Sequence, residues 1–294
     1  MSKKKKIIIE DFLEALIIRP KDSAKISVNS QLQPHYNRQT EFNHCVIKFG
    51  NFFDDLKNSL IPLKERWPEF GSMPTQVFLC PQNEAMDQMT IIANNPRAYF
   101  NKDLKKKYRL SLAAALKEIA KKANLSSNSQ KIAIKRAGVV AANLLRGPNK
   151  ALIYEAKRLP FLDGALGVGV EDEQGILAKA NLDNQDLEID EVFLASGSTI
   201  LAFIIDCHSR SIKPKSLTII APFTTQLGAK TVLDLSRRLG WNTKILANRI
   251  YYQMDDHWYV LVTPQEAVWK KVSKGNKKIK VQAGGDAGDL TEKD

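Results

Sequence analysis

The feature that most constrains the fold is an alternation of short apolar runs and amphipathic segments in the second half of the chain. Apolar runs suited to buried strands occupy residues 131–135, 187–195, 216–223 and 242–247. Helical spacing of apolar residues occupies residues 199–208 and 226–239, between those runs. This order predicts an α/β fold with a central, mostly parallel sheet flanked by helices. Such sheets bind ligands at the carboxyl ends of their strands, so function is expected in the turns that leave these runs.

The first 125 residues carry weaker signals. Residues 1–45 combine a lysine-rich start with a polar stretch that lacks either period, which predicts a basic, irregular arm able to dock on a partner subunit. Residues 46–125 are predicted to be mostly helical. Apolar residues recur at helical spacing from Cys45 to Leu63, residues 75–80 resemble a short strand, and residues 104–123 give the clearest helix. A polar linker near Ser126 to Ser129 opens the α/β domain, predicted over residues 126–294.

Composition bounds the class of protein. Hydrophobic residues make up 44% of the 294 residues and charged residues 26%, as in ordinary globular proteins. No apolar run approaches the roughly 20 residues that span a bilayer, and the run after Lys6 is too short for a secretory signal. We therefore expect no membrane partner and a cytoplasmic location. The three cysteines are far apart, which predicts neither a disulfide framework nor a thiolate metal site.

The net charge of +12 favours polyanions, which include nucleotides, pyrophosphate and nucleic acid. The basic residues are scattered in small clusters along the chain. Two interpretations stay open: solvation of exposed helix faces and tails, or a dedicated nucleic-acid surface.

The turn after the predicted strand at residues 187–194 has the chemistry of a phosphate site. Gly197 allows the backbone to approach a ligand closely. The hydroxyls of Ser196, Ser198 and Thr199 can donate to phosphate oxygens. The first turn of the following helix adds free N–H groups and a favourable dipole.

Two carboxylates, Asp190 and Glu191, lie just upstream within the apolar run. Burying a carboxylate is costly unless it binds something, and ribose hydroxyls, a magnesium-bound water or a cation would serve. The alternative for this segment is that Ser198 or Thr199 only caps a helix while the acids pair with lysines.

The whole arrangement resembles the phosphoribosyl pyrophosphate loop of type I phosphoribosyltransferases, in which an apolar strand and two acids precede a Thr/Ser-Gly-Ser/Thr turn and a helix. The alanine in LASGS is most similar to the uracil phosphoribosyltransferase branch. Three further segments are similar in the family's order: IKRAGVV at residues 134–140, a strand and loop from Leu217, and residues 247–260. The resemblance covers about residues 130–289 and implies the family's fold.

The resemblance also implies roles for particular residues. The turn with Arg136, Ala137 and Gly138 would receive pyrophosphate. The ribose phosphate would bind Asp190 and Glu191 through its hydroxyls and metal shell, and it would bind the loop formed by Ala195, Ser196, Gly197, Ser198 and Thr199.

Near the C-terminus, GDAGD at residues 285–289 is similar to the Gly-Asp-x-Gly-Asp of uracil phosphoribosyltransferases. By resemblance, Gly285, Asp286 and Ala287 would shape the base site, with Asp286 facing the sugar and metal. The alternative is a flexible Gly/Asp-rich tail. Lys157 or Arg158 would add a cation for pyrophosphate, unless they are only exposed basic residues before a turn.

The implied reaction is displacement of pyrophosphate from phosphoribosyl pyrophosphate by a ring nitrogen of a base. The acidic side chains of Asp190, Glu191 and Asp286 would be the catalytic residues. Magnesium would be held through the ligand and water rather than by direct protein ligands. The expected partners are phosphoribosyl pyrophosphate or a nucleotide, a nitrogenous base, and a second copy in a homodimer.

The alternative is a non-catalytic relative that senses a nucleotide or binds nucleic acid or a protein partner. It is favoured by the lysine-rich segment at residues 263–281, which interrupts the family's base loop, and by the enlarged basic N-terminal region.

Overall fold

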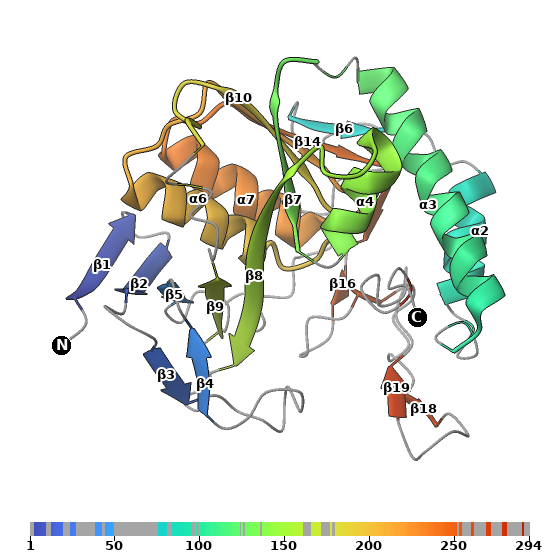
Figure 1. Cartoon of the computed structure of the whole chain (residues 1–294), viewed down its shortest axis with the longest axis horizontal. Coiled ribbons are helices and arrows are strands. Elements are labelled where there is room, and N and C mark those ends of the chain that lie inside the picture. Colours follow the sequence, from blue (N-terminus) through green and yellow to red (C-terminus); the bar gives the residue numbers. More distant parts are fainter. Residues whose placement is uncertain are drawn as a thin grey trace.

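Ten strands form one continuous sheet through the protein (Figure 1). Parallel neighbours make up one side, in the order β8 (Leu152–Pro160), β7 (Gln130–Ile134), β10 (Asp186–Asp190), β12 (Ser216–Ile220), β14 (Thr243–Ala247) and β6 (Val77–Leu79). Antiparallel strands extend it beyond β8, in the order β9 (Leu166–Glu171), β5 (Cys45–Phe49), β2 (Leu13–Arg19) and β1 (Lys3–Ile9).

This computed structural model describes residues 3–9, 13–19, 24–27, 39–42, 45–49, 76–80, 84–93, 95, 98, 100–123, 125, 127–135, 137–160, 166–171, 177, 180–251, 253–254, 260–261, 269–271, 278–280 and 290.

Helices cover both faces of the sheet, which confirms the predicted fold class (Figure 1). The helices α6 (Ser198–Ser209) and α7 (Gln226–Arg238) pack on one face. On the other face lie α3 (Lys102–Ala123) and α4 (Ala137–Arg146), with α2 (Glu84–Ala93) against α3. Neighbouring residues of β12 show the strand alternation, because Ile219 belongs to the core under α6 and Ile220 to the core under α3 and α4.

A smaller parallel sheet continues the carboxyl ends of β10, β12 and β14. It contains β11 (Phe193–Leu194), β13 (Phe223–Thr225) and β15 (Arg249–Tyr251). The predicted strands at residues 187–195 and 216–223 are therefore each divided in two. Phe193, Phe223 and Tyr251 stack on this sheet, with ring centroids 5.5 to 6.2 Å apart. The division places Glu191 and Val192 between the main sheet and the small sheet.

Three two-stranded ribbons complete the described strands. They pair β3 (Ala24–Ser27) with β4 (Gln39–Phe42), β16 (Gln253–Met254) with β17 (Val260–Leu261), and β18 (Trp269–Lys271) with β19 (Lys278–Lys280). None of the helices in the described ranges combines the length and apolarity needed to cross a membrane.

The N-terminal segment differs from the sequence-based expectation. Residues 1–45 were expected to be irregular, but they contain β1 and β2 at the edge of the main sheet and the ribbon of β3 and β4. A lysine run does not prevent strand pairing at a sheet edge, because pairing uses the backbone and lysines are common there.

The helix expected from Cys45 is also wrong at its start, because Cys45–Phe49 forms β5. This strand is almost fully buried, so it lacks the alternation that marks a half-buried strand, and its apolar spacing imitated a helix. Residues 50–63 of that expected helix lie outside the described residues. The proposed domain boundaries stay predictions.

Candidate functional site

The turn between β11 and α6 lies where the strands of the small sheet end, and its conformation requires glycine at one position. Gly197 has a φ of 79°, in the left-handed region. A Cβ there would lie 3.0 Å from Cγ2 of Val232 and 3.2 Å from the carbonyl oxygen of Gly228. A larger residue would therefore meet both a strained backbone and the surface of α7.

The N-terminus of α7 fixes the position of the segment at residues 195–199. Oγ1 of Thr225 donates to the carbonyl oxygen of Ala195 at 2.5 Å and accepts from the backbone N–H of Gly228 at 2.8 Å. A Cβ on Gly228 would lie 2.2 Å from the same Ala195 oxygen. The turn is thus fixed in position before any ligand arrives, which lowers the entropy cost of binding.

The hydroxyl groups of the turn are arranged around the start of α6. Oγ of Ser196 donates to Oγ of Ser198 at 3.1 Å and accepts from the Ser198 backbone N–H at 3.3 Å. Both serines are buried, whereas Thr199 is half-buried. The N-cap residue is Gly197, so neither Ser198 nor Thr199 caps α6. The other part of that alternative, in which the acids pair with basic side chains, applies to Asp190, although its partner is Arg146 rather than a lysine.

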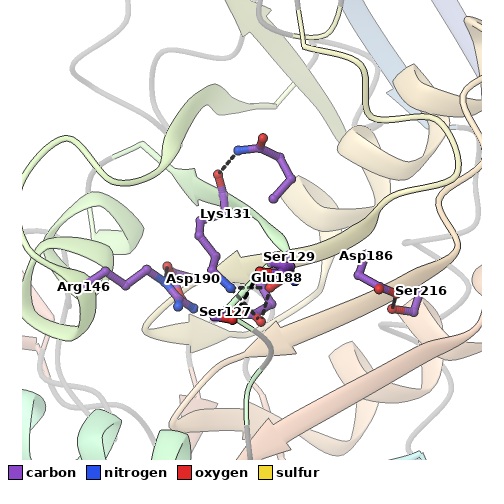
Figure 2. Close-up of polar contacts among 10 residues, drawn as sticks. Ser127, Ser129, Lys131, Arg146, Asp186, Glu188, Asp190 and Ser216 are labelled. Atoms are coloured by element: carbon purple, nitrogen blue, oxygen red, sulfur yellow. Dashed lines mark hydrogen bonds and ion pairs between the residues drawn. The ribbon is translucent and has the colours of Figure 1, made fainter.

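Of the two predicted acids, Asp190 is fully buried and held by an arginine (Figure 2). Nε of Arg146 donates to Oδ2 of Asp190 at 2.8 Å, and Nη2 donates to Oδ1 at 3.0 Å. Burial raises the pKa of Asp190, and the bonds from Arg146 oppose that rise. Both of its oxygens already have a partner within the protein.

The same arginine reaches a second acid that sequence reasoning missed. Nη2 of Arg146 donates to Glu188 at 2.6 Å, and Nζ of Lys131 lies 2.9 Å from the other Glu188 oxygen, which also accepts from Ser129 (Figure 2). Glu188 is two residues before Asp190 on β10 and is paired in register with Lys131 of β7. The two-residue strand period, which puts both acids on one face, was the signal that could have identified this cluster.

Glu191 stands apart from this cluster, at the carboxyl end of β10. Its backbone N–H donates to the carbonyl oxygen of Ile220 at 2.9 Å, and Oε1 accepts from the N–H of Val192 at 2.8 Å. Burial raises the pKa of Glu191 to about 7, while the N–H groups of Val192 and Phe193 and the charge of Arg158 oppose the rise. A carboxyl group that titrates near neutrality can exchange a proton at physiological pH.

The predicted pyrophosphate cations, Lys157 and Arg158, lie on β8 where it pairs with β9. Only residues 152–154 of β8 pair with β7, so the rest of β8 extends past the carboxyl end of that strand. Lys157 lies 3.3 Å from Glu155, which also pairs with Lys135. Arg158 is close enough to Glu191 to influence its pKa. Lys157 and Arg158 are both half-buried, and their role toward pyrophosphate stays a prediction.

Several other predicted residues are placed differently or fall outside the described ranges. Ala137 and Gly138 form the first turn of α4, where a Cβ on Gly138 would lie 2.5 Å from the carbonyl oxygen of Asp190. Gly138 therefore permits close packing of α4 on β10. Arg136 and the GDAGD segment, with Gly285, Asp286 and Ala287, lie outside the described residues.

The last feature of the site is its capacity to hold a metal ion. Within the ranges that the structure describes, no group of three or more His, Cys, Asp or Glu side chains could hold a metal ion. Glu191 offers a single carboxylate, which suits magnesium only when phosphate oxygens and water supply the remaining ligands.

Comparison with known proteins gives no family by sequence: no protein-family model and no curated protein matches the chain. Among solved structures, the AQ2163 protein of Aquifex aeolicus is similar at 12% identity, over 63% of this chain and 91% of that chain, with a TM-score of 0.43. Adenine phosphoribosyltransferase of Trypanosoma brucei, in complex with AMP, pyrophosphate and ribose-5-phosphate, has 8% identity over 58% of this chain and 83% of that chain, with a TM-score of 0.39. Adenine phosphoribosyltransferase (APRTase) of Giardia lamblia, complexed with 9-deazaadenine, has 14% identity over 49% of this chain and 81% of that chain, with a TM-score of 0.34. These low values say nothing about the activity of this chain.

Proposed function

We propose that this protein binds phosphoribosyl pyrophosphate with magnesium and transfers the ribosyl phosphate to a nitrogenous base, releasing pyrophosphate. The observation that carries the proposal is that two features follow the carboxyl end of β10 in the same connection to α6. One is a rigid, hydroxyl-lined turn at residues 195–199, and the other is the carboxyl group of Glu191. Parallel sheets bind ligands at this edge.

In this proposal the turn holds the 5′-phosphate. The hydroxyl of Thr199 and the backbone N–H groups at the start of α6 would donate to its oxygens, and the dipole of the 12-residue helix favours the negative charge. The buried hydroxyls of Ser196 and Ser198 would shape the turn, because they already bond each other.

Glu191 rather than Asp190 is proposed to face the ribose. Both oxygens of Asp190 accept from Arg146, whereas Glu191 is half-buried at the end of the strand. In its ionised form Glu191 would accept hydrogen bonds from the ribose hydroxyls and offer one oxygen toward the metal shell. Arg158, on the extended part of β8, would contribute positive charge for the leaving pyrophosphate.

Glu191 and water would help to hold magnesium that is carried by the pyrophosphate group of the ligand, and the metal would supply positive charge to that group. The bond from the anomeric carbon to the pyrophosphate oxygen would break, a bond to a ring nitrogen of the base would form, and the proton of that nitrogen would pass to water. The chain's own contribution is positioning and charge stabilisation. The base site, proposed at Gly285, Asp286 and Ala287, and the pyrophosphate contact of Arg136 rest on the family resemblance alone.

The test is pyrophosphate release from phosphoribosyl pyrophosphate and magnesium, measured across a panel of purine and pyrimidine bases that includes uracil. We expect release with one class of base, and a fall of about a hundredfold or more in Glu191→Gln, because transition-state charge stabilisation is lost. Asp186→Asn is the matched control, since Asp186 is the acid at the opposite end of β10. Equal loss in both variants would contradict the role of Glu191.

A second candidate function is nucleotide sensing without transfer. The observation that favours it is the Arg146–Asp190 pair, which leaves Glu191 as the acid available at this strand end. Binding of phosphoribosyl pyrophosphate or a nucleoside monophosphate, with no pyrophosphate release for any base, would support sensing over transfer.

A further inference from the structure

The helix α4 is attached to β10 at both of its ends. At its first turn, Gly138 lies so close to β10 that an added Cβ would be 2.5 Å from the carbonyl oxygen of Asp190. At its last residue, Arg146 reaches back and donates to both side-chain oxygens of Asp190. Both ends of α4 therefore contact the same residue: Gly138 packs against the backbone of Asp190, and Arg146 binds its side chain.

The charges in this contact balance within the protein. Arg146 and Lys131 face Glu188 and Asp190, and the side chains of Asp190 and Glu188 are 0% and 3% exposed. Figure 2 shows Arg146 pointing from α4 toward Asp190, with Lys131 and Ser129 converging on Glu188. The cluster needs no external ligand, and its geometry is fixed by charge-assisted bonds.

Two predicted ligand-binding elements depend on that geometry. One is the first turn of α4, with Ala137 and Gly138, and the other is Glu191, which follows Asp190 directly. Any shift of α4 relative to Asp190 would change the distance between that turn and Glu191. Because bond making requires reacting groups within a few tenths of an ångström of their optimum, such a shift would be costly.

We propose that Arg146 is a positioning residue for the phosphoribosyl site: by locking α4 onto Asp190 it holds the first turn of α4, with Ala137 and Gly138, and Glu191 at their working separation. This role rests on the proposed function, since it assumes that both elements contact the same ligand.

The guanidinium group is essential to this role because of its shape. Nε and Nη2 engage Asp190 together while Nη2 also reaches Glu188, which requires a planar fork with several donors. A lysine ammonium keeps the charge but cannot make the same set of contacts. Arg146→Lys therefore separates position from charge.

The matched control is Arg210→Lys. Arg210 also donates through Nε to a fully buried aspartate, Asp206, at 3.1 Å, but that aspartate lies four residues earlier in α6, so the bond does not attach a helix to β10. Both variants weaken a buried ion pair, and only one of them alters α4.

The first measurement is steady-state kinetics with phosphoribosyl pyrophosphate and magnesium. We expect kcat/KM to fall by about tenfold to a hundredfold in Arg146→Lys and to change less than about twofold in Arg210→Lys, at matched thermal stability. Wild-type kcat/KM in a folded Arg146→Lys variant would overturn the proposal.

The second measurement needs no ligand. Selective ¹³C labelling of glutamate allows the carboxyl carbon of Glu191 to be titrated by NMR, with Glu191→Gln giving the assignment. The charged groups that act on Glu191 are Asp190, which raises its pKa, and Arg158, which lowers it. Arg146→Lys should raise the Glu191 midpoint, because an ammonium group cannot make both bonds to Asp190 and its charge then lies less close to that carboxylate, and Arg210→Lys should leave the midpoint unchanged.

A further variant keeps the proposal testable if Arg146→Lys does not fold. Asp190→Asn keeps the side-chain shape and breaks the charge pair, so kcat/KM should fall similarly while the Glu191 midpoint moves down. An unchanged midpoint and unchanged kinetics would overturn the proposal. Absence of ligand binding by the wild type would instead contradict the proposed function, and the NMR titration would still decide whether Arg146 controls Glu191.

Discussion

Gly228 lies directly beneath Ala195: a Cβ at position 228 would be 2.2 Å from the Ala195 carbonyl oxygen, and 3.0 Å from that of Leu194. The same Ala195 oxygen accepts a hydrogen bond from Thr225. The helix α7 therefore supports the proposed phosphate turn through backbone contact as well as through a side chain.

Replacing Gly228 with alanine should move that turn. We expect Gly228→Ala to destabilise the protein by about 1–3 kcal/mol through overpacking, and to weaken the binding of phosphoribosyl pyrophosphate, as measured by urea unfolding and calorimetry. Gly240→Ala is the control, because Gly240 has a φ of 67° but its Cβ would meet only Nζ of Lys213 at 3.7 Å. The Gly240→Ala variant should lose stability through backbone strain but bind phosphoribosyl pyrophosphate as the wild type does. Equal affinity in both variants would contradict the supporting role of α7.

The raised pKa of Glu191 gives stability a defined pH dependence. Below the ordinary value of 4.5, Glu191 is protonated in both the folded and the unfolded states. Between 4.5 and about 7 the unfolded chain releases this proton while the folded protein keeps it, so stability falls as the pH rises. The cost reaches up to about 3 kcal/mol above neutrality.

Glu191→Gln should remove this component. Urea unfolding from pH 4.5 to 8 should show a flatter profile for the variant than for the wild type, with the gain largest above pH 7. A variant whose profile runs parallel to that of the wild type would contradict the assignment of the raised pKa to Glu191.

The Arg146 cluster should dominate the electrostatic contribution to stability. Arg146→Met leaves Asp190 and part of Glu188 buried without their main partner, and we expect a loss of about 3–5 kcal/mol in the free energy of unfolding. Lys230→Met breaks the exposed pair of Lys230 with Asp234, 3.0 Å apart, and should cost less than about 1 kcal/mol. Comparable losses would show that the buried cluster is not tightly coupled.

The stacked rings on the small sheet should also matter for stability. Phe223 is fully buried and stacks with Phe193 and Tyr251, so Phe223→Leu should cost about 1–3 kcal/mol. Phe100, which is 47% exposed, provides the control, and Phe100→Leu should change stability by less than about 0.5 kcal/mol. Thermal unfolding of both variants measures the difference.

Much of the α/β region could be predicted from the sequence because its apolar runs and helical spacings are long and regular. The strand at Gln130–Ile134 and the helices at Ser198–Ser209 and Gln226–Arg238 lie within a few residues of their expected positions. The N-terminal strands could not be predicted, because Lys3–Ile9 is an edge strand rich in charge and Cys45–Phe49 is buried too fully to show alternation.

The contacts of the candidate site could be predicted only in part, for a physical reason. The acidic pair at Asp190 and Glu191 was recognised, but adjacent strand residues point to opposite faces, so only tertiary contacts could show that Arg146 binds the first of them. The support of Ala195 by Thr225 and Gly228 is likewise a contact between segments about thirty residues apart, which no local pattern encodes.

The most direct test of the proposed function is a calorimetric titration of the wild-type protein with phosphoribosyl pyrophosphate in the presence of magnesium. We predict saturable binding of one ligand per chain, with an affinity that falls at least about tenfold in Gly197→Ala, because the left-handed turn can no longer form without strain. Absence of binding to the wild type, or wild-type affinity in Gly197→Ala, would contradict the assignment of residues 195–199 as the phosphate site.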